Sequence, residues 1–416
     1  MPLAGLSIGK RSALLLDKEN MTKYSISPMS SLYELYLRHP RISTDSRRIE
    51  PDSVFFALRG ASFDGNRFAA DALEKGAAYA VVDDPSLPNT RPDKADRLIV
   101  VDDALQTLQT LAREHRRELG LPILAITGSN GKTTTKELVS RVLAEKYEVY
   151  ATRGNLNNHI GVPLTLLAMT RDVEFGIVEM GASACGEIAL LCSIAEPNYG
   201  IVTNIGRAHL EGFGGPEGVR RGKGELYDWL ARTGGRVFVP ANDPVLMSMA
   251  AERETLAAEC YPTTLADGME HHLEGDYNRF NVAAAVAVGR YFGVDDERIR
   301  YAVGSYRPDN HRSQKIRTGQ NTLILDCYNA NPSSMQASLV NFRQEPLEGC
   351  TRKILILGDM LELGDWSDAE HRHIISLAAE IPDARILLVG PHFAKAYRSL
   401  ESRPADTTLY PSQEVL

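Results

Sequence analysis

The stretch ITGSNGKTTTKE (residues 126–137) decides the fold class of this chain. Its first two residues close LPILAIT, an apolar run typical of a strand that is buried on both faces. Leu138, Val139, Val142 and Leu143 follow at helical spacing. A strand, a glycine loop and a helix in this order are the surroundings that a phosphate-binding loop requires. The alternative is an ordinary glycine turn that carries a solvated lysine.

The loop departs from the standard G-x-x-x-x-G-K-[ST] spelling because its first glycine is Gly128, which makes it two residues shorter. Its backbone N–H groups should surround phosphate oxygens at the positive end of the following helix. Lys132 should reach the outer phosphates, and Thr133 should bind a magnesium ion. The predicted phosphate-binding residues are Gly128, Ser129, Asn130, Gly131, Lys132, Thr133 and Thr134.

The composition limits the number of domains and the class of partner. The 416 residues are 43% hydrophobic and 24% charged, and should form several domains at roughly 100 to 200 residues each. A net charge of -8 and a pI near 5.8 give no electrostatic footprint for nucleic acid or an anionic membrane. We therefore expect no nucleic-acid partner and no membrane partner.

The cysteines and the N-terminal residues indicate the compartment. The five cysteines include no C-x-x-C pair, and an odd, scattered set favours reduced thiols over disulfides or a zinc site. The apolar run ALLL is too short for a signal-peptide core or a membrane span. The sequence therefore predicts a cytoplasmic protein, in which residues 1–28 form a poorly ordered extension.

Strands and helices alternate along the rest of the chain, which predicts an α/β fold with mostly parallel sheets. SVFFALRG, AAYAVVDD and RLIVVDD are the expected strands of a first unit, and FAADALEKGA is a helix between them. ALQTLQTLAREHRRELG should form a helix that ends at Gly120. The predicted divisions are a small α/β domain over residues 29–104, a linker helix over 105–120, a central domain over 121–311 and a C-terminal domain over 312–416.

Two further predicted strands end in residues that could bind a metal ion or take part in catalysis. FGIVEMGA places Glu179 at the end of a strand, and YGIVTNIGRAHLEGFG leads from a strand into His209. Ligand crevices of open α/β sheets lie outside the carboxyl ends of the strands, so Lys132, Glu179 and His209 should converge. A Mg²⁺ ion would compensate the cost of a carboxylate in an apolar strand. The alternatives are a strand-end salt bridge for Glu179 and an ordinary hydrogen-bonded loop histidine.

Six motifs, in order, resemble the ATP-dependent Mur ligases of peptidoglycan synthesis. They are AITGSNGKTTTKE, RGNLNNHIGVPLTLL, VEMGA, NIGRAHLEGFGGPEGVRRGKGELY, DCYNANPSSM and LGDMLELG. The likeness runs from Met29 onward and is greatest to the members that join D-alanyl-D-alanine to UDP-N-acetylmuramoyl-tripeptide. It implies a UDP-substrate domain, a central ATPase domain and a Rossmann-like C-terminal domain. The short loop spelling is the one that this family uses.

The resemblance also implies a reaction. These ligases use ATP to phosphorylate a substrate carboxylate, an amine then attacks the acyl phosphate, and an amide forms with release of ADP and phosphate. Phosphoryl transfer needs positioning and charge neutralisation, which a phosphate loop, a lysine and magnesium supply. ATP and Mg²⁺ are therefore the expected cofactors. Separate lobes imply closure around the substrates to exclude water, and the chain is expected to be a monomer.

By resemblance, three residues act at the reaction centre, namely Lys132, His209 and Lys223. Lys132 and Thr133 would bind the ATP phosphates and a first magnesium ion, Glu179 would join in metal binding, and His209 would hold a second ion. Lys223 matches a lysine that the family carries as a carbamate, which offers the oxygen ligands that an ammonium group lacks. Without the family, Lys223 would be a solvated helix lysine.

The resemblance assigns further residues to ATP and to the two substrates that are joined. Asn278 and Asn281 would lie beside adenine, although helix capping is an alternative and Tyr277 stands where many relatives have histidine. Arg312 and Asp326 would reach ATP on closure. The candidate substrate contacts are Ser46, Arg47 and the loop 60–64 for UDP, Asn155, Asn157 and Asn158 for the peptide arm, and Tyr328, Asn329 and Asn331 for the second substrate. The asparagines before Pro332 could instead only form a turn.

Two departures leave other readings open. GASACGEI has Ser183 and Ala184 where relatives often have asparagine and histidine, and the chain ends at LYPSQEVL, before a further segment expected of the third domain, which predicts an exposed sheet edge. The alternatives are a Mur ligase that adds the third peptide residue, a folylpolyglutamate synthase, or a catalytically impaired nucleotide-binding relative. The sequence does not distinguish meso-diaminopimelate from lysine at that third residue.

Overall fold

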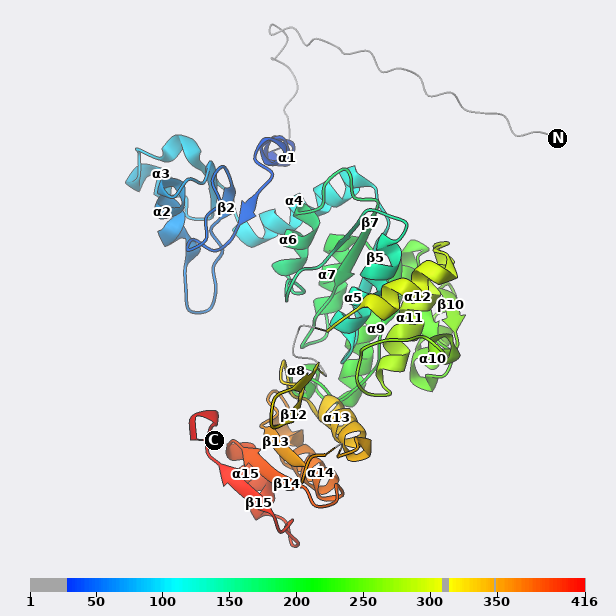
Figure 1. Cartoon of the computed structure of the whole chain (residues 1–416). Helices are drawn as coiled ribbons and strands as arrows, with labels where there is room; N and C mark the ends of the chain where they lie inside the picture. The colour runs from blue at the N-terminus through cyan, green and yellow to red at the C-terminus, as the bar shows by residue number, and fades with distance from the viewer. Residues whose placement is uncertain (1–27, 309–313, 348, 416) are drawn as a thin grey trace, which may run out of the picture.

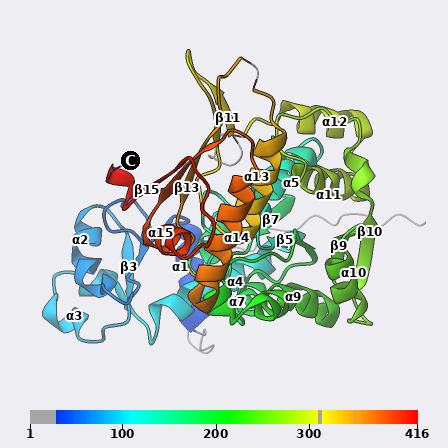
Figure 2. The same ribbon diagram turned by 90° about the horizontal axis from the view of Figure 1, so that it is seen from below.

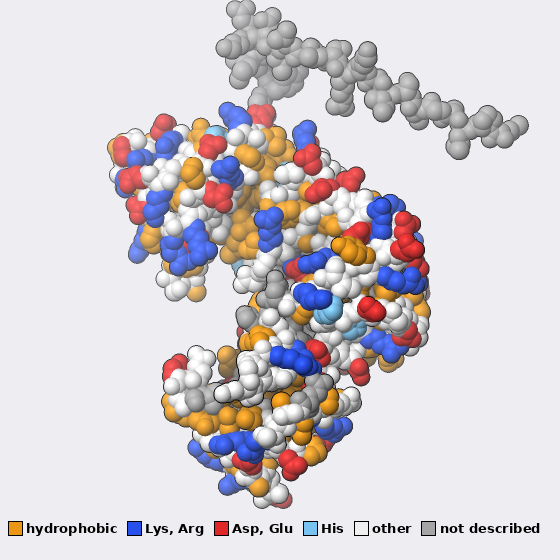
Figure 3. All heavy atoms as spheres, viewed as in Figure 1, with side chains coloured by type: hydrophobic (Ala, Val, Ile, Leu, Met, Phe, Trp, Pro, Cys, Tyr) orange, Lys and Arg blue, Asp and Glu red, His pale blue; other side chains and the backbone are white. Residues whose placement is uncertain are grey.

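The protein consists of three lobes arranged in an open arc (Figure 1). A computed structural model describes residues 28–308, 314–347 and 349–415. The predicted poorly ordered extension therefore lies outside the described residues, apart from its last residue. The space-filling view shows that the molecule is hollowed between the N-terminal and C-terminal lobes (Figure 3). Within the described ranges, no helix is long and apolar enough to cross a membrane.

The N-terminal lobe is a parallel sheet with short helices. Its strands lie in the order β1-β2-β3-β4, and the core between sheet and helices includes Phe55, Ala72, Leu73 and Val82. The three predicted strands are present and β1 adds a fourth; two residues are too short a run for periodicity to reveal. The elements are α1 (Pro28–Arg38), β1 (Ile42–Ser43), β2 (Val54–Phe56), η1 (Gly65–Phe68), α2 (Ala69–Glu74), β3 (Tyr79–Val82), α3 (Leu87–Thr90), η2 (Ala95–Arg97) and β4 (Leu98–Val100).

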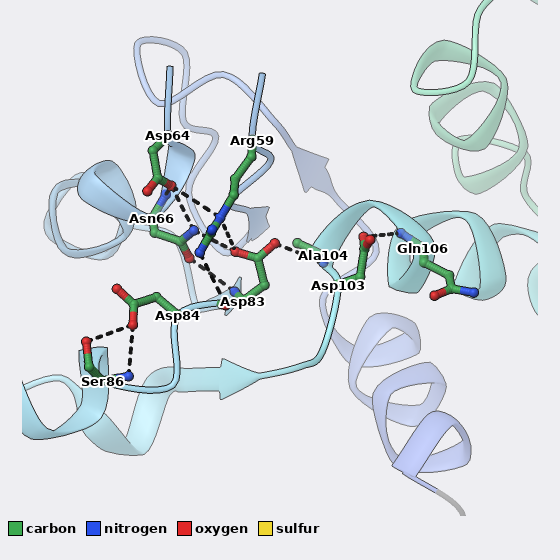
Figure 4. A network of polar contacts seen from close by, with 9 residues as sticks. All are labelled: Arg59, Asp64, Asn66, Asp83, Asp84, Ser86, Asp103, Ala104 and Gln106. Atoms are coloured by element: carbon green, nitrogen blue, oxygen red, sulfur yellow. Dashed lines mark hydrogen bonds and ion pairs between the residues drawn. The ribbon is translucent and has the colours of Figure 1, made fainter. Parts of the chain in front are cut away.

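The carboxylate of Asp83 ties this lobe together at the end of β3 (Figure 4). It accepts hydrogen bonds from Arg59 Nε at 2.8 Å and Asn66 Nδ2 at 2.7 Å, and its other oxygen lies 3.5 Å from the backbone nitrogen of Ala104. In return, the backbone N–H of Asp83 donates to Asn66 Oδ1. One side chain thus joins the loop after β2 to the start of the helix that begins at Ala104.

That helix, α4 (Ala104–Leu119), joins the first two lobes. Asp103 caps its first turn by accepting from the backbone N–H of Gln106, and it ends at Gly120 in the left-handed conformation, with φ 64°. Leu108 and Leu111 on its buried face are fully buried in an apolar cluster that contains residues of both the N-terminal and the central lobes. The predicted linker is therefore a packed helix.

The central lobe is a six-stranded parallel sheet in the order β10-β9-β8-β5-β7-β6. β5 lies in the middle, which explains why LPILAIT is continuously apolar. The elements are β5 (Ile123–Thr127), α5 (Lys132–Ala144), β6 (Val149–Ala151), α6 (Gly161–Leu167), β7 (Phe175–Glu179), α7 (Glu187–Ala195), β8 (Tyr199–Val202), α8 (Leu210–Phe213), α9 (Pro216–Thr233), β9 (Arg236–Pro240), α10 (Pro244–Ala251), β10 (Ala257–Tyr261), η3 (Thr263–Ala266), α11 (Asn278–Tyr291) and α12 (Asp296–Ser305).

Helices cover both faces of this sheet. α4, α6, α7, α9 and α10 pack on one face, and α5, α11 and α12 pack on the other. Val139 and Val142 of α5 are fully buried, as the helical spacing predicted. This two-sided cover makes the sheet a doubly covered α/β layer and leaves its strand ends as the place for polar chemistry.

The C-terminal lobe contains the parallel sheet β13-β14-β15 and a separate antiparallel hairpin, β11–β12. Figure 2 looks onto this lobe from below, with α13 and α14 side by side next to the sheet. Ile354 and Ile356 on edge strand β13 are exposed. The elements are β11 (Gln314–Arg317), β12 (Thr322–Leu325), α13 (Pro332–Gln344), β13 (Ile354–Gly358), η4 (Gly364–Trp366), α14 (Ser367–Ala379), β14 (Arg385–Val389), α15 (Pro391–Arg398), β15 (Thr407–Tyr410) and η5 (Gln413–Val415).

The core of the C-terminal lobe continues into the central lobe. Leu210 and Phe213 of α8 are buried in the same apolar cluster as Leu357, Leu363 and Ile374 of the C-terminal lobe. The two lobes therefore share hydrophobic packing at α8, which lies between them (Figure 1).

Replacing Asp83 by Ala should destabilise the N-terminal lobe by about 2 kcal/mol, because Arg59 and Asn66 lose a partly buried charged acceptor. Hydrogen exchange of residues 57–66 would measure this loss. Asp84→Ala is the matched control, since the Asp84 carboxylate bonds to Ser86 alone in the same network, and it should cost about 1 kcal/mol or less. Equal losses in both variants would contradict a central role for Asp83.

Candidate functional site

The loop between β5 and α5 is shaped by two glycines in positive-φ conformations. Gly128 has φ 137° and Gly131 has φ 79°. A Cβ on Gly128 would lie 2.0 Å from Thr203 Oγ1, so only glycine lets the loop pass the end of β8. Gly131 is the N-cap of α5, so the loop lies at the N-terminus of that helix. The local fold is the one that anion binding at a helix N-terminus requires.

The loop is braced by the segment after β8. The backbone N–H of Asn130 donates to Asn204 Oδ1 at 3.1 Å, and Asn204 Nδ2 donates to the carbonyl of Asn130 at 3.0 Å. Ser129 Oγ accepts from the backbone N–H of Gly206 at 2.9 Å. Sequence reasoning missed Asn204, although its place at the carboxyl end of a central strand was a usable signal.

Lys132 folds back over the loop that it follows. Its Nζ donates to the carbonyls of Gly128 at 2.8 Å and Ser129 at 3.0 Å. Thr134 lies on the wall of the adjoining cavity, whereas Thr133, the residue expected to bind magnesium, lies outside that wall. The positive charge of Lys132 is thus held at the mouth of the loop.

Asn278 and Asn281 support the loop from α11. Asn281 Oδ1 accepts from Thr135 Oγ1 at 3.0 Å, and Asn281 Nδ2 donates to Asn278 Oδ1 at 2.8 Å. A Cβ on Gly131 would lie 2.7 Å from Asn281 Oδ1. Asn278 Nδ2 also donates to the carbonyl of Glu274. Both residues are buried and line the cavity, so they support the loop and also form part of the cavity wall.

Glu179 ends β7, and the residue is 1% exposed. One carboxylate oxygen accepts from Asn157 Nδ2 at 2.8 Å, while the other accepts no hydrogen bond from any residue that the structure describes. Lys136 Nζ is 4.0 Å from that second oxygen. A buried carboxylate oxygen without a hydrogen bond is costly, and a hard cation satisfies it. The carboxylate therefore fits a magnesium ligand.

Lys136 is a second buried residue that the sequence reading missed. It is 1% exposed, and its Nζ donates to the carbonyl of Thr152 at 2.7 Å and pairs with Glu137 at 2.9 Å. Its helical position, beside the apolar residues of α5, was the available signal, because a lysine on a buried face needs a partner. Lys136 places a positive charge beside Glu179.

Lys223 is also buried, at 2% exposure, so the reading as a solvated helix lysine is wrong. Its Nζ donates to the carbonyl of Ala182 at 3.0 Å and lies 5.0 Å from the centre of the Phe213 ring. Burial lowers the pKa of Lys223 to about 7, and the charge of Lys132 contributes. Near pH 7 part of the Lys223 amine is therefore uncharged. The uncharged amine is the form that reacts with carbon dioxide to give a carbamate.

His209 lies just before α8 in the left-handed conformation, with φ 53°. Its Nδ1 is bonded to the carboxylate of Glu362, which comes from the C-terminal lobe. Both residues line the cavity. Glu362 belongs to LGDMLELG, a motif whose role the sequence left unexplained.

Asn331 connects the C-terminal lobe directly to the phosphate loop. Its Nδ2 donates to Asn130 Oδ1 at 2.8 Å, and its Oδ1 accepts from the backbone N–H of Ser334, which caps α13. The alternative for Asn331 was a turn before Pro332, and the structure gives it the cap of α13 together with a contact to the phosphate loop. Asp326 accepts from Ser338 Oγ, and Arg312 lies outside the described residues.

These side chains meet at a cavity of about 890 Å³ between the central and C-terminal lobes. Predicted residues on its wall are Ser129, Asn130, Gly131, Lys132, Thr134, Asn157, Asn158, Glu179, His209, Asn278, Asn281, Asp326, Tyr328, Asn329 and Asn331. Gly128, Thr133, Asn155 and Lys223 lie outside the wall. Ser46 and Arg47 are on the N-terminal lobe, where Arg47 pairs with Asp45. The part of the chain that the structure describes contains no cluster of three or more His, Cys, Asp or Glu suited to a metal ion.

Asp359 and His371 hold the loop that carries Glu362. The Asp359 carboxylate accepts from the backbone N–H groups of His392 and Phe393, both at 2.8 Å, at the start of α15. His371 Nε2 accepts from the backbone N–H of Met360 at 3.1 Å, and Nδ1 is 2.7 Å from the carbonyl of Ser367. These bonds specify the neutral tautomer with the proton on Nδ1.

Comparison with known proteins gives one consistent family. Residues 40–116 match the Mur ligase family, catalytic domain; residues 126–265 match the Mur ligase middle domain; and residues 311–411 match the Mur ligase, glutamate ligase domain. A UDP-N-acetylmuramoyl-tripeptide--D-alanyl-D-alanine ligase from Bacillus subtilis (strain 168) is 37% identical over 359 residues, which are 80% of this chain and 76% of the relative. A ligase of the same name from Escherichia coli (strain K12) is 31% identical, with 84% and 81% covered.

Solved structures agree in fold. A crystal structure of MurF from Acinetobacter baumannii matches with a TM-score of 0.79 and 30% identity, covering 90% of this chain and 84% of that chain. MurF from Thermotoga maritima in complex with ADP matches with a TM-score of 0.74, covering 90% and 94%. The Thermotoga maritima chain is 24% identical and therefore supports the fold alone.

Stability of the C-terminal lobe should fall in mild acid because of His371. Burial lowers the pKa of His371, so below about pH 6.5 the unfolded chain binds a proton that the folded chain does not, and stability is lost as the pH falls toward the folded value. Hydrogen exchange at Met360 should show a smaller loss on acidification in His371→Gln. His373 is exposed, and the variant His373→Gln should lose as much stability on acidification as the unaltered protein. A smaller loss in His373→Gln would contradict the assignment to His371.

Proposed function

The chain belongs to the Mur ligase family, and we propose that it is the ATP-dependent ligase that joins D-alanyl-D-alanine to UDP-N-acetylmuramoyl-tripeptide in peptidoglycan precursor synthesis. The observation that carries the proposal is the cavity in which the phosphate loop, Lys132 and the buried Glu179 face residues of a second lobe. A bond-forming ligase needs these groups together, whereas a simple nucleotide-binding protein does not.

The reaction assigns distinct tasks to these groups. A carboxylate oxygen of the tripeptide attacks the γ-phosphorus of ATP, the bond to ADP breaks, and an acyl phosphate forms. The amine of D-alanyl-D-alanine then attacks the acyl carbon, phosphate leaves and the amine loses a proton. The backbone N–H groups of the loop and Lys132 neutralise phosphate charge during the first step.

Mg²⁺ ions are the cations that we assign to the same centre. Thr133, Glu179, His209 and Lys223, as its carbamate, would hold them. When bound, they would shield phosphate charge and bring the carboxylate close to the nucleotide. The lowered pKa of Lys223 supports the carbamate, because the neutral amine adds to carbon dioxide with loss of one proton.

The substrates are assigned to the lobes as follows. Ser46, Arg47 and the loop 60–64 would bind the UDP end, and Asn155, Asn157 and Asn158 would lie along the peptide arm. Tyr328, Asn329 and Asn331 would meet the second substrate, and Asp326 and Arg312 would contact ATP on closure. The bonds from Asn157 to Glu179 and from Asn331 to Asn130 add a supporting role for these two amides.

The proposed domains follow the three lobes and fit the remaining expectations. We propose residues 29–104 as the UDP-substrate domain, 105–120 as the linker helix, 121–311 as the ATP-binding domain and 312–416 as the ligase domain. We further propose a cytoplasmic monomer, in line with the five free thiols of Cys185, Cys192, Cys260, Cys327 and Cys350. Closure of the lobes would keep water from the acyl phosphate.

Phosphate release from ATP with Mg²⁺ and UDP-N-acetylmuramoyl-tripeptide, with and without D-alanyl-D-alanine, tests the function. Release should depend on the dipeptide, and mass spectrometry should find the tripeptide substrate extended by the dipeptide. Binding of both nucleotides without turnover would instead favour a catalytically impaired relative. Turnover with a single diamino acid in place of the dipeptide would favour a ligase that adds the third residue.

Lys132→Ala should lower turnover by at least about 10²-fold, because phosphate charge in the transition state loses its nearest lysine. Binding of UDP-N-acetylmuramoyl-tripeptide, measured by calorimetry, should stay largely unchanged, since that substrate is assigned mainly to another lobe. Lys146→Ala is a control just beyond the far end of α5, where Nζ bonds to the carbonyls of Phe292 and Gly293. Equal loss of turnover and UDP-substrate binding in Lys132→Ala would argue against separate sites.

A further inference from the structure

Glu362 makes two contacts to the segment that contains His209. Its carboxylate is bonded to His209 Nδ1, and its backbone carbonyl accepts from the backbone N–H of Glu211 at 3.1 Å. The first contact fixes one ring nitrogen of the histidine, and the second fixes the register between the two segments. We refer to this pair of bonds as the Glu362 clasp.

The backbone at the clasp is held in an uncommon conformation on both sides. His209 has φ 53° and Glu362 has φ 59°, in the left-handed region that residues with a Cβ adopt rarely. Such conformations persist where the surroundings fix them, and they concentrate at functional sites. Here the neighbouring Leu210 and Leu363 are buried in one apolar cluster, which fixes both segments.

The two segments approach each other closely. A Cβ on Gly364 would lie 3.2 Å from Glu211 Cβ, and a Cβ on Gly215 would lie 2.9 Å from the Trp366 ring. The clasp is therefore part of a close interface rather than a chance surface pair. It lies on the wall of the cavity, because His209 and Glu362 both line it.

A carboxylate on one ring nitrogen is the arrangement that orients a metal-binding histidine. Histidine ligands commonly donate their other N–H to a carboxylate, which sets the tautomer and the ring plane and makes the ligand nitrogen more basic. With Nδ1 engaged by Glu362, Nε2 is the nitrogen left to serve as ligand. The partner residue comes from the C-terminal lobe, although the histidine belongs to the central lobe.

We propose that Glu362 is a positioning residue for divalent-cation binding at His209, so that the C-terminal lobe completes a cation site of the central lobe. This inference rests on the proposed function, since it takes His209 as a cation ligand. It gives LGDMLELG a specific role, in which Asp359 and His371 hold the loop and Glu362 acts on the histidine.

Binding of Mn²⁺, as a substitute for Mg²⁺, to the full chain with a non-hydrolysable ATP analogue tests this role by electron paramagnetic resonance. The unaltered protein should bind a second ion, and Glu362→Ala should lower the affinity for that ion by about 10- to 100-fold. Glu362→Gln should lie between the two, because its amide oxygen still accepts from Nδ1 without the charge. Absence of a second ion in the unaltered protein, or unchanged affinity in both variants, would overturn the proposal.

Glu370→Gln is the matched control for loosening of the lobes. Glu370 also joins the lobes, through Oε1 at 2.6 Å from Arg207 Nη1, but it does not contact His209. Its variant should retain second-ion affinity, and a loss equal to that of Glu362→Ala would show that lobe contact, not histidine positioning, is responsible. If Mn²⁺ affinity depends on Glu362 but the protein has no ligase turnover, the proposed function alone is refuted. If turnover is normal but the Glu362 substitutions leave Mn²⁺ affinity unchanged, this inference alone is refuted.

Discussion

The structure depends on keeping charged groups buried at the end of a parallel sheet. Glu179 and Lys136 are each 1% exposed, and Lys223 is 2% exposed. Burial of a charge is expensive unless a partner compensates it, and the compensation here is incomplete: one oxygen of Glu179 receives no hydrogen bond from the described residues. The scaffold of covered strands fixes these groups where substrates and cations, rather than protein atoms, can complete their interactions.

Sequence reasoning succeeded where one local pattern determines the outcome. Continuous apolar residues predicted that β5 is buried on both faces, and the spacing of Leu138 and Val142 predicted the buried face of α5. Gly120 ended its helix as predicted, because a left-handed C-cap favours glycine. The convergence of Lys132, Glu179 and His209 on one side of the sheet followed from topology alone, since parallel strands present their carboxyl ends to a common edge.

Features that depend on contacts between distant segments were not accessible in this way. No local pattern reveals that Glu362 reaches His209 from another lobe, or that β12 pairs in a separate hairpin. The burial of Lys223 was likewise hidden, because it arises when α8 folds against α9. Lys136 was a different case, since its position on an apolar helix face was visible in the sequence but a single lysine there is usually solvated.

The packing around Phe213 links the chemistry of the central lobe to the position of the C-terminal lobe. Its ring faces Lys223 Nζ at 5.0 Å and also belongs to the apolar core of the C-terminal lobe. A Cβ on Gly222 would lie 2.4 Å from that ring, so the Phe213 ring packs directly against the backbone of α9 at Gly222. The Phe213 ring therefore packs against the buried Lys223 of the central lobe and against the apolar core of the C-terminal lobe at the same time. Because protein interiors are close-packed, this one side chain joins the packing of the two lobes.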